Sequence, residues 1–180
     1  MKILVISTPV FPVPVSGYSG LEHLAWLIAK GLAELENEVS LVAPTGSYCP
    51  NVNVIDCGPA GYTNEEQAFQ TYWHLLHTFD AVIDHSWNKW ALNIKSEGKI
   101  TTPVLSVLHA PVNTMYQSLP DVQKPCFVAI SKDQASHFRD LFGRQIPHCY
   151  NGVDPEYYNP IVTGKQSKVF GRLEAIGTSY

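Results

Sequence analysis

The sequence predicts an α/β fold of the doubly wound, Rossmann-like class, with helices on both faces of one parallel sheet. Two observations predict this class. Short apolar runs such as Glu38–Ala43 recur along the chain, and each is followed by a segment whose apolar residues are spaced for a helix. Strands that alternate with helices in this way form right-handed crossovers, which place successive strands parallel in a single sheet.

The first elements set the pattern. Residues 2–7 form an apolar run bounded by Pro9 and Pro12, which is typical of a buried central strand. Apolar residues then recur at helical spacing through 20–36, which predicts an amphipathic helix packed on that strand. Glu38–Ala43 is the next strand, so the chain begins with a strand, a glycine-bearing turn, a helix and a second strand.

The same alternation continues to about residue 150. Further strands are predicted at 53–56, 81–84, 104–108, 126–130 and 146–150. Helices are predicted at 65–79, 89–97, 114–118 and 132–141. Thr63 or Asn64 can cap the first of these helices, Ser131 can cap the last, and Gly143 can end it.

Composition excludes several classes of function. A chain of 180 residues that is 45% hydrophobic buries the core of one domain, and its net charge of −4 with no Lys/Arg block argues against nucleic acid as a partner. No apolar run reaches the ~20 residues of a membrane helix, and the start is not a secretory signal, so the expected location is cytoplasmic. The four cysteines and seven histidines lack the close spacing of a metal site, so no metal is expected.

Several motifs occur in an order that is more specific than any one of them. The string PVPVSGYSGLEHLAWLIAKGLAELENEVSLVAP is followed by His109 after the strand at 104–108, by Ser131 after the strand at 126–130, and by NGVD at 151–154. Over about residues 1–160 this arrangement resembles the amino-terminal part of retaining glycosyltransferases of family 4, which have the GT-B fold.

The resemblance implies one lobe of a two-lobe enzyme. Residues 1–160 would form the amino-terminal, acceptor-side Rossmann-like domain, and 161–180 a linker or the start of a missing carboxy-terminal lobe. The implied reaction moves a sugar from a nucleotide diphosphate sugar to a hydroxyl acceptor, a glycan, lipid or small molecule, with retention and without a bound cofactor or metal. Peripheral membrane association is left open. The isolated lobe is not expected to turn over.

The glycine loop is the first candidate binding segment. Gly17, Tyr18, Ser19 and Gly20 lie between the first strand and its helix, where free helical N–H groups and the helix dipole favour an anion such as the donor diphosphate. The alternative is that Gly17 and Gly20 only make a tight turn. Glu22, just inside the helix, could cap it or hold the loop.

Other candidates follow strands at the carboxyl edge of the sheet, where open α/β sheets bind ligands. Ser131 is an expected N-cap, and the resemblance implies that it also lines the cleft. Asn151 and Gly152 are the other candidate donor contacts. The alternative for these two residues is that they only shape the hinge toward the linker. His109 is the candidate catalytic residue: the resemblance implies that it contacts the transferred sugar, and the alternative is a satisfied loop histidine.

The candidate acceptor-binding residues lie at and just after the end of the strand predicted at 81–84. Asp84 and His85 close that strand, and Trp87 follows; an aromatic ring at this edge stacks on a sugar face or covers the core. His85 and Trp87 are the predicted acceptor-binding residues.

Two other functions remain from the sequence. The chain could be a free-standing nucleotide- or sugar-binding module, or a nucleotide-sugar epimerase of the same fold. Hydrolase and P-loop functions are disfavoured, since there is no G-x-S-x-G elbow or GKS/GKT loop. Nicotinamide binding is disfavoured because the second strand ends in Ala43-Pro44, not in an acidic residue.

Overall fold

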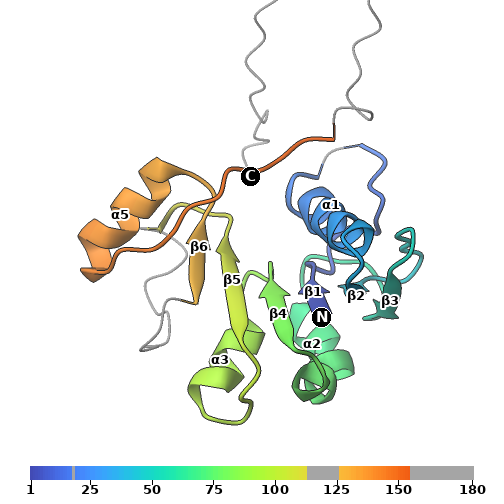
Figure 1. Cartoon of the computed structure of the whole chain (residues 1–180). Coiled ribbons are helices and arrows are strands. Elements are labelled where there is room, and N and C mark those ends of the chain that lie inside the picture. Colours follow the sequence, from blue (N-terminus) through green and yellow to red (C-terminus); the bar gives the residue numbers. More distant parts are fainter. Residues whose placement is uncertain (18, 113–125, 155–180) are drawn as a thin grey trace, which may run out of the picture.

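The computed structural model describes residues 1–17, 19–112 and 126–154. Within them, one parallel sheet has the strand order β3-β2-β1-β4-β5-β6, and every neighbouring pair of strands is parallel (Figure 1). The strands are β1 (Lys2–Ile6), β2 (Glu38–Ala43), β3 (Asn53–Asp56), β4 (Ala81–Asp84), β5 (Val104–Leu108) and β6 (Phe127–Ala129). The predicted Rossmann-like α/β class is confirmed.

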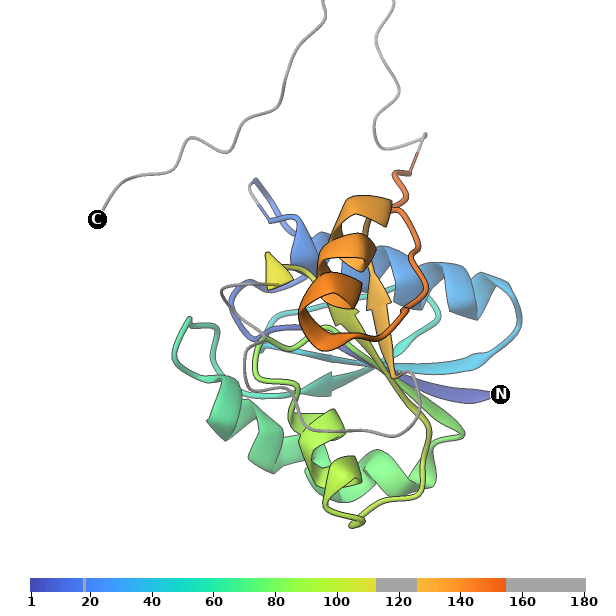
Figure 2. The ribbon, with the colours of Figure 1, turned by 90° about the vertical axis from the view of Figure 1, so that its left-hand side faces the viewer.

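Helices lie on both faces of this sheet, as Figures 1 and 2 show. They are α1 (Leu21–Glu34), α2 (Glu65–Tyr72), the 3₁₀ helix η1 (Trp73–Thr78), α3 (Trp90–Ser96) and α5 (Lys132–Phe142). The helix α1 covers one face, α2, η1 and α3 cover the other, and α5 packs beside the edge strand β6. The helix predicted at 114–118 lies outside the described residues. No helix in the described ranges is long and apolar enough to cross a membrane.

The core has two parts because side chains of a strand alternate between the two faces of the sheet. Val5 and Leu41 pack with Ala25 and Ala29 of α1 on one face. On the other face, Leu4 of β1 packs with the helices α2, η1 and α3, and it is fully buried. Complete burial of such a side chain stabilises the fold by about 1.5–3 kcal/mol, so the sheet is a rigid support for the loops at its ends.

The helix α5 begins and ends where the sequence predicts. The Ser131 hydroxyl accepts a hydrogen bond from the Gln134 backbone N–H at 3.0 Å, an N-cap that contributes about 1 kcal/mol. Gly143 ends the helix in the left-handed conformation, with φ 66°, and its N–H donates to the Arg139 carbonyl at 2.8 Å. By contrast, Asn64 precedes α2 without a side-chain cap: its amide donates to the Pro59 carbonyl at 2.9 Å.

Two predicted elements differ from the structure. The helix predicted at 65–79 is α-helical only to Tyr72 and continues as η1. The strand predicted at 146–150 is reduced to a single parallel bridge between Ala129 and His148. The Ala129 N–H donates to the Pro147 carbonyl at 3.0 Å, and the Cys149 N–H donates to the Ala129 carbonyl at 2.8 Å. The bond that would extend this ladder toward residue 146 needs an N–H on Pro147, which proline lacks, so the strand cannot extend in that direction.

Candidate functional site

Two pockets adjoin at the carboxyl ends of the strands and share His109 and Ile130 in their walls. The glycine-loop pocket has a volume of about 320 Å³, and its lining includes Ser19, Gly20, Glu22, Trp87, His109 and Asn151. The α5 pocket has a volume of about 640 Å³, and its lining includes His109, Ala110, Ser131, Asp133, Gln134 and His137. This edge is where Rossmann-like sheets bind ligands.

Glu22 organises the glycine loop. Its buried carboxylate accepts hydrogen bonds from the hydroxyls of Thr8, after β1, and Ser19, before α1. It therefore ties the end of β1 to the start of the helix, which is the loop-holding role the sequence suggests, and its charge favours the helix N-terminus. Gly17 has φ 118°, a conformation that requires glycine, but it does not line the pocket. Tyr18 lies outside the described residues.

His85 and His109 form a contact that the sequence does not reveal. The Nδ1 of His85 lies 2.8 Å from the Nε2 of His109, and the two rings meet edge to edge, with centroids 5.0 Å apart and an interplanar angle of 29°. His85 is 0% exposed and lines neither pocket. The predicted acceptor residue therefore contacts the predicted catalytic residue, because His85 turns inward beneath the loop that carries His109.

Burial keeps both imidazoles neutral. Desolvation lowers the pKa of His85 well below its ordinary value, with a smaller contribution from the neighbouring His109. Desolvation, assisted by the charge of Lys89, lowers the pKa of His109 to about 3. A neutral pair shares one N–H across its contact, so the tautomer of one ring sets the tautomer of the other. His109 thus presents a neutral, oriented ring to both pockets.

Three buried charged residues lie near the histidine pair. Asp84, Lys89 and Glu65 are all buried, and the Lys89 ammonium donates to the Val107 carbonyl of β5 at 2.7 Å. Burial lowers the pKa of Lys89 and raises the pKa of Asp84, and the attraction between their opposite charges moderates both shifts. Burial also raises the pKa of Glu65, and hydrogen bonds from Trp87 and Asn88 moderate that shift. The sequence gives no signal for Lys89 or Glu65, since both occur where surface residues are usual.

Glu65 also positions Trp87. One carboxylate oxygen accepts from the Trp87 backbone N–H at 2.6 Å, and the other accepts from the Asn88 backbone N–H at 3.1 Å and from the Asn88 side chain. These bonds hold the loop after β4 by its backbone. They leave the Trp87 ring, 36% exposed, at the wall of the glycine-loop pocket.

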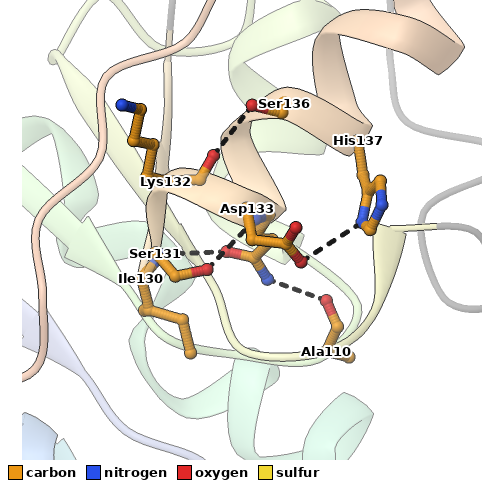
Figure 3. Close-up of polar contacts among 8 residues, drawn as sticks. Ala110, Ile130, Ser131, Lys132, Asp133, Ser136 and His137 are labelled. Atoms are coloured by element: carbon orange, nitrogen blue, oxygen red, sulfur yellow. Dashed lines mark hydrogen bonds and ion pairs between the residues drawn. The ribbon is translucent and has the colours of Figure 1, made fainter.

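Gln134 fixes the other side of the His109 loop. Its side-chain oxygen accepts from the Ile130 N–H at 2.8 Å, and its amide donates to the carbonyls of Leu108 at 3.1 Å and Ala110 at 2.9 Å. The contacts draw Ala110 and Ile130 to the first turn of α5 (Figure 3). In the lining of the α5 pocket, the Nδ1 of His137 lies 3.6 Å from a carboxylate oxygen of Asp133. Gln134 was not predicted, because only the fold brings these two loops together.

The segment after the last bridge runs from α5 across the carboxyl edge toward α1 (Figure 1). Asn151 lines the glycine-loop pocket. Gly152 lines a third pocket of about 670 Å³ over α1, and the Asp154 carboxylate lies 3.3 Å from the Lys30 ammonium. The sequence-predicted residues Ser19, Gly20, Trp87, His109 and Asn151 therefore meet in one pocket, with Ser131 in the adjoining one.

The remaining reactive side chains form no second centre in the part of the chain that the structure describes. No group of three or more His, Cys, Asp or Glu residues there could hold a metal ion. The four cysteines are free thiols. Burial raises the pKa of Cys49 to about 11 and that of Cys57 to about 12, so both are poor nucleophiles near neutral pH.

Comparison with known proteins shows the fold. Sucrose-phosphate synthase from Thermosynechococcus elongatus aligns with a TM-score of 0.58 at 14% sequence identity, over 83% of this chain and 47% of that one. The C-terminal domain of the coenzyme A biosynthesis bifunctional protein CoaBC aligns with a TM-score of 0.43 at 16% identity, over 78% and 68%. This chain thus spans about half of the synthase. No protein-family profile and no curated protein sequence matches it.

Proposed function

We propose that this chain is the amino-terminal, acceptor-side lobe of a GT-B glycosyltransferase that moves a sugar from a nucleotide diphosphate sugar to a hydroxyl, with retention. The observation that carries the proposal is the meeting of Ser19 and Gly20 of the glycine loop with His109 and Asn151 in one pocket at the carboxyl edge. These are the motifs whose order resembles family 4. The chain has a fold in common with sucrose-phosphate synthase, whose name describes the synthesis of a phosphorylated sugar. That shared fold is compatible with the proposal.

In this proposal His109 acts on the transferred sugar. Its neutral ring hydrogen-bonds a sugar hydroxyl and supports the positive charge that develops at the reacting carbon. His85 does not touch the sugar. It orients the His109 ring and couples the tautomers of the two rings through the 2.8 Å contact, and the charge of the buried Lys89 acts on both rings. Because His85 already holds the His109 ring in place, that ring needs little reorganisation when positive charge develops on the sugar. Such pre-organisation is the condition for effective electrostatic stabilisation.

The diphosphate needs positive charge from outside this lobe. Ser19 and Gly20 offer backbone N–H groups, and Asn151 lines the same pocket while Ser131 lines the adjoining one. No Lys or Arg is among the described lining residues of the glycine-loop or α5 pocket, and Glu22 adds negative charge. We therefore assign the base, the ribose and most phosphate contacts to a second lobe, for which residues 161–180 are a linker or the start.

The isolated chain should bind nucleotide diphosphate sugars weakly or not at all. A few N–H groups on one face of an open cleft compete poorly with water for a solvated diphosphate. Calorimetric titration of residues 1–180 with the common nucleotide sugars, beside a protein that also contains the second lobe, measures this. Micromolar binding to residues 1–180 alone would contradict the half-enzyme and favour a free-standing binding module.

A further inference from the structure

We propose that the glycine-loop pocket binds one neutral pyranose ring, that of the acceptor, against an aromatic rim formed by Phe11, Tyr62 and Trp87. The term acceptor rests on the proposed function, whereas the sugar subsite does not. The three aromatic residues line the same pocket as His109 and come from three loops that are far apart in the sequence. Of the three, only Trp87 is predicted from the sequence.

Contacts between the loops hold the three aromatic rings at the pocket. Tyr62 is 79% exposed, and its ring meets Phe11 edge to face, with centroids 5.9 Å apart and an interplanar angle of 82°. The Gly61 N–H donates to the Pro9 carbonyl at 2.8 Å, which ties the loop of Tyr62 to the loop of Phe11. Trp87 is held through its backbone by Glu65. Exposed rings fixed by their backbones at a pocket indicate a binding surface, since they cover no core.

The remaining lining matches a ring that carries several hydroxyls. Ser19, Glu22, His109 and Asn151 place hydroxyl, carboxylate, imidazole and amide groups around the same space. A phenol has a single hydroxyl and could hydrogen-bond few of these groups. A pyranose offers C–H faces to the aromatic rings and hydroxyls to the polar groups. The volume of about 320 Å³ is at the lower end of the ~300–1,000 Å³ of small-molecule sites, which suits one ring.

Charge selects a neutral sugar over a sugar phosphate. Glu22 is the sole Asp, Glu, Lys or Arg among the described residues that line this pocket. His109 stays neutral because burial lowers its pKa to about 3. A phosphate would therefore meet a carboxylate and no Lys or Arg side chain among the described lining residues, which disfavours its desolvation here.

Protein-observed NMR of residues 1–180 tests this subsite. The probes are the methyl pyranosides of glucose, galactose and mannose, titrated to their solubility limits while the Trp87 indole signal is followed. At least one should shift that signal saturably. Tyr62→Ala should weaken that binding about 3–10-fold, the scale of one aromatic contact. This exposed side chain can be removed without unfolding the chain. The matched control is Trp73→Leu, 46% exposed on η1 and outside the pocket, which should bind unchanged.

Further probes separate the other occupants. Hexose 6-phosphates and phenol should bind more weakly than the best neutral glycoside, and tighter binding of either would overturn the proposal. A Trp87 shift produced by nucleotide sugars but by no methyl glycoside would assign the ring to the donor. No shift with any glycoside, or equal affinity in Tyr62→Ala, would remove the subsite. Because the readout is binding, failure of sugar transfer would count against the proposed function and not against the subsite.

Discussion

Replacing His109 by alanine in the two-lobe protein is expected to lower the rate of sugar transfer about 30- to 1,000-fold, which corresponds to about 2–4 kcal/mol of lost transition-state stabilisation. The proposed role of the ring is at the sugar, where it supplies one pre-organised polar contact. His109 lines both pockets and is only partly buried, so the fold should survive its removal. Steady-state kinetics with the matching donor measure the effect.

The matched control for that measurement is His74→Ala. His74 is exposed on η1 and lies in neither pocket, so its removal should leave transfer unchanged. Circular dichroism of both variants checks that the fold is kept. Near-normal turnover of His109→Ala would remove His109 from the mechanism and leave its loop with a structural role.

Acid should destabilise the fold through the His85–His109 pair. Both imidazoles stay neutral in the folded chain, whereas the unfolded chain takes up their protons below the ordinary pKa of 6.5. The stability tied to neutral His109 is therefore complete above pH 6.5 and is lost as pH falls toward about 3. Between pH 6.5 and about 5 this loss amounts to about 2 kcal/mol for His109, and His85 adds a loss of the same sign.

Denaturant unfolding of wild type and His109→Gln across this pH range measures that loss. The raised pKa values of Glu65 and Asp84 act in the opposite direction, because their protonation on acidification favours the folded chain. The difference between wild type and variant isolates the histidine. His109→Gln should show a smaller loss of unfolding free energy than wild type, and His74→Gln should match wild type. Parallel pH curves for wild type and His109→Gln would contradict a buried neutral imidazole.

The sheet was predictable because its strands are local patterns. The apolar run of β1 and the helical spacing of α1 identify each element alone, and the crossover rule then fixes the parallel pairing. Ser131 and Gly143 carry cap chemistry that acts within a few residues. The carboxyl-edge positions of His109 and Trp87 follow from the same logic, since His109 comes directly after β5 and Trp87 lies in the loop after β4.

The parts that were not predictable depend on contacts across the fold. The strand expected at 146–150 cannot pair before His148, because Pro147 lacks the N–H for that bond, and this matters only once its ladder partner is known. The contact between His85 and His109 joins two loops, and so does the support of Trp87 by Glu65. A glutamate in the first turn of a helix is usually a surface residue, and nothing near it in the sequence marks it as the anchor of a distant tryptophan.

The most direct test of the glycosyltransferase assignment is sugar transfer by a protein that contains residues 1–180 and the second lobe. Proton NMR of the reaction with a nucleotide diphosphate sugar and neutral glycoside acceptors reports both the transfer and the configuration of the new anomeric centre. We predict a glycoside product with the anomeric configuration of the donor, formed by the two-lobe protein and not by residues 1–180 alone. Inversion at the anomeric carbon would contradict the retaining assignment, and release of free sugar or an epimerised nucleotide sugar without a glycoside product would contradict the transferase itself.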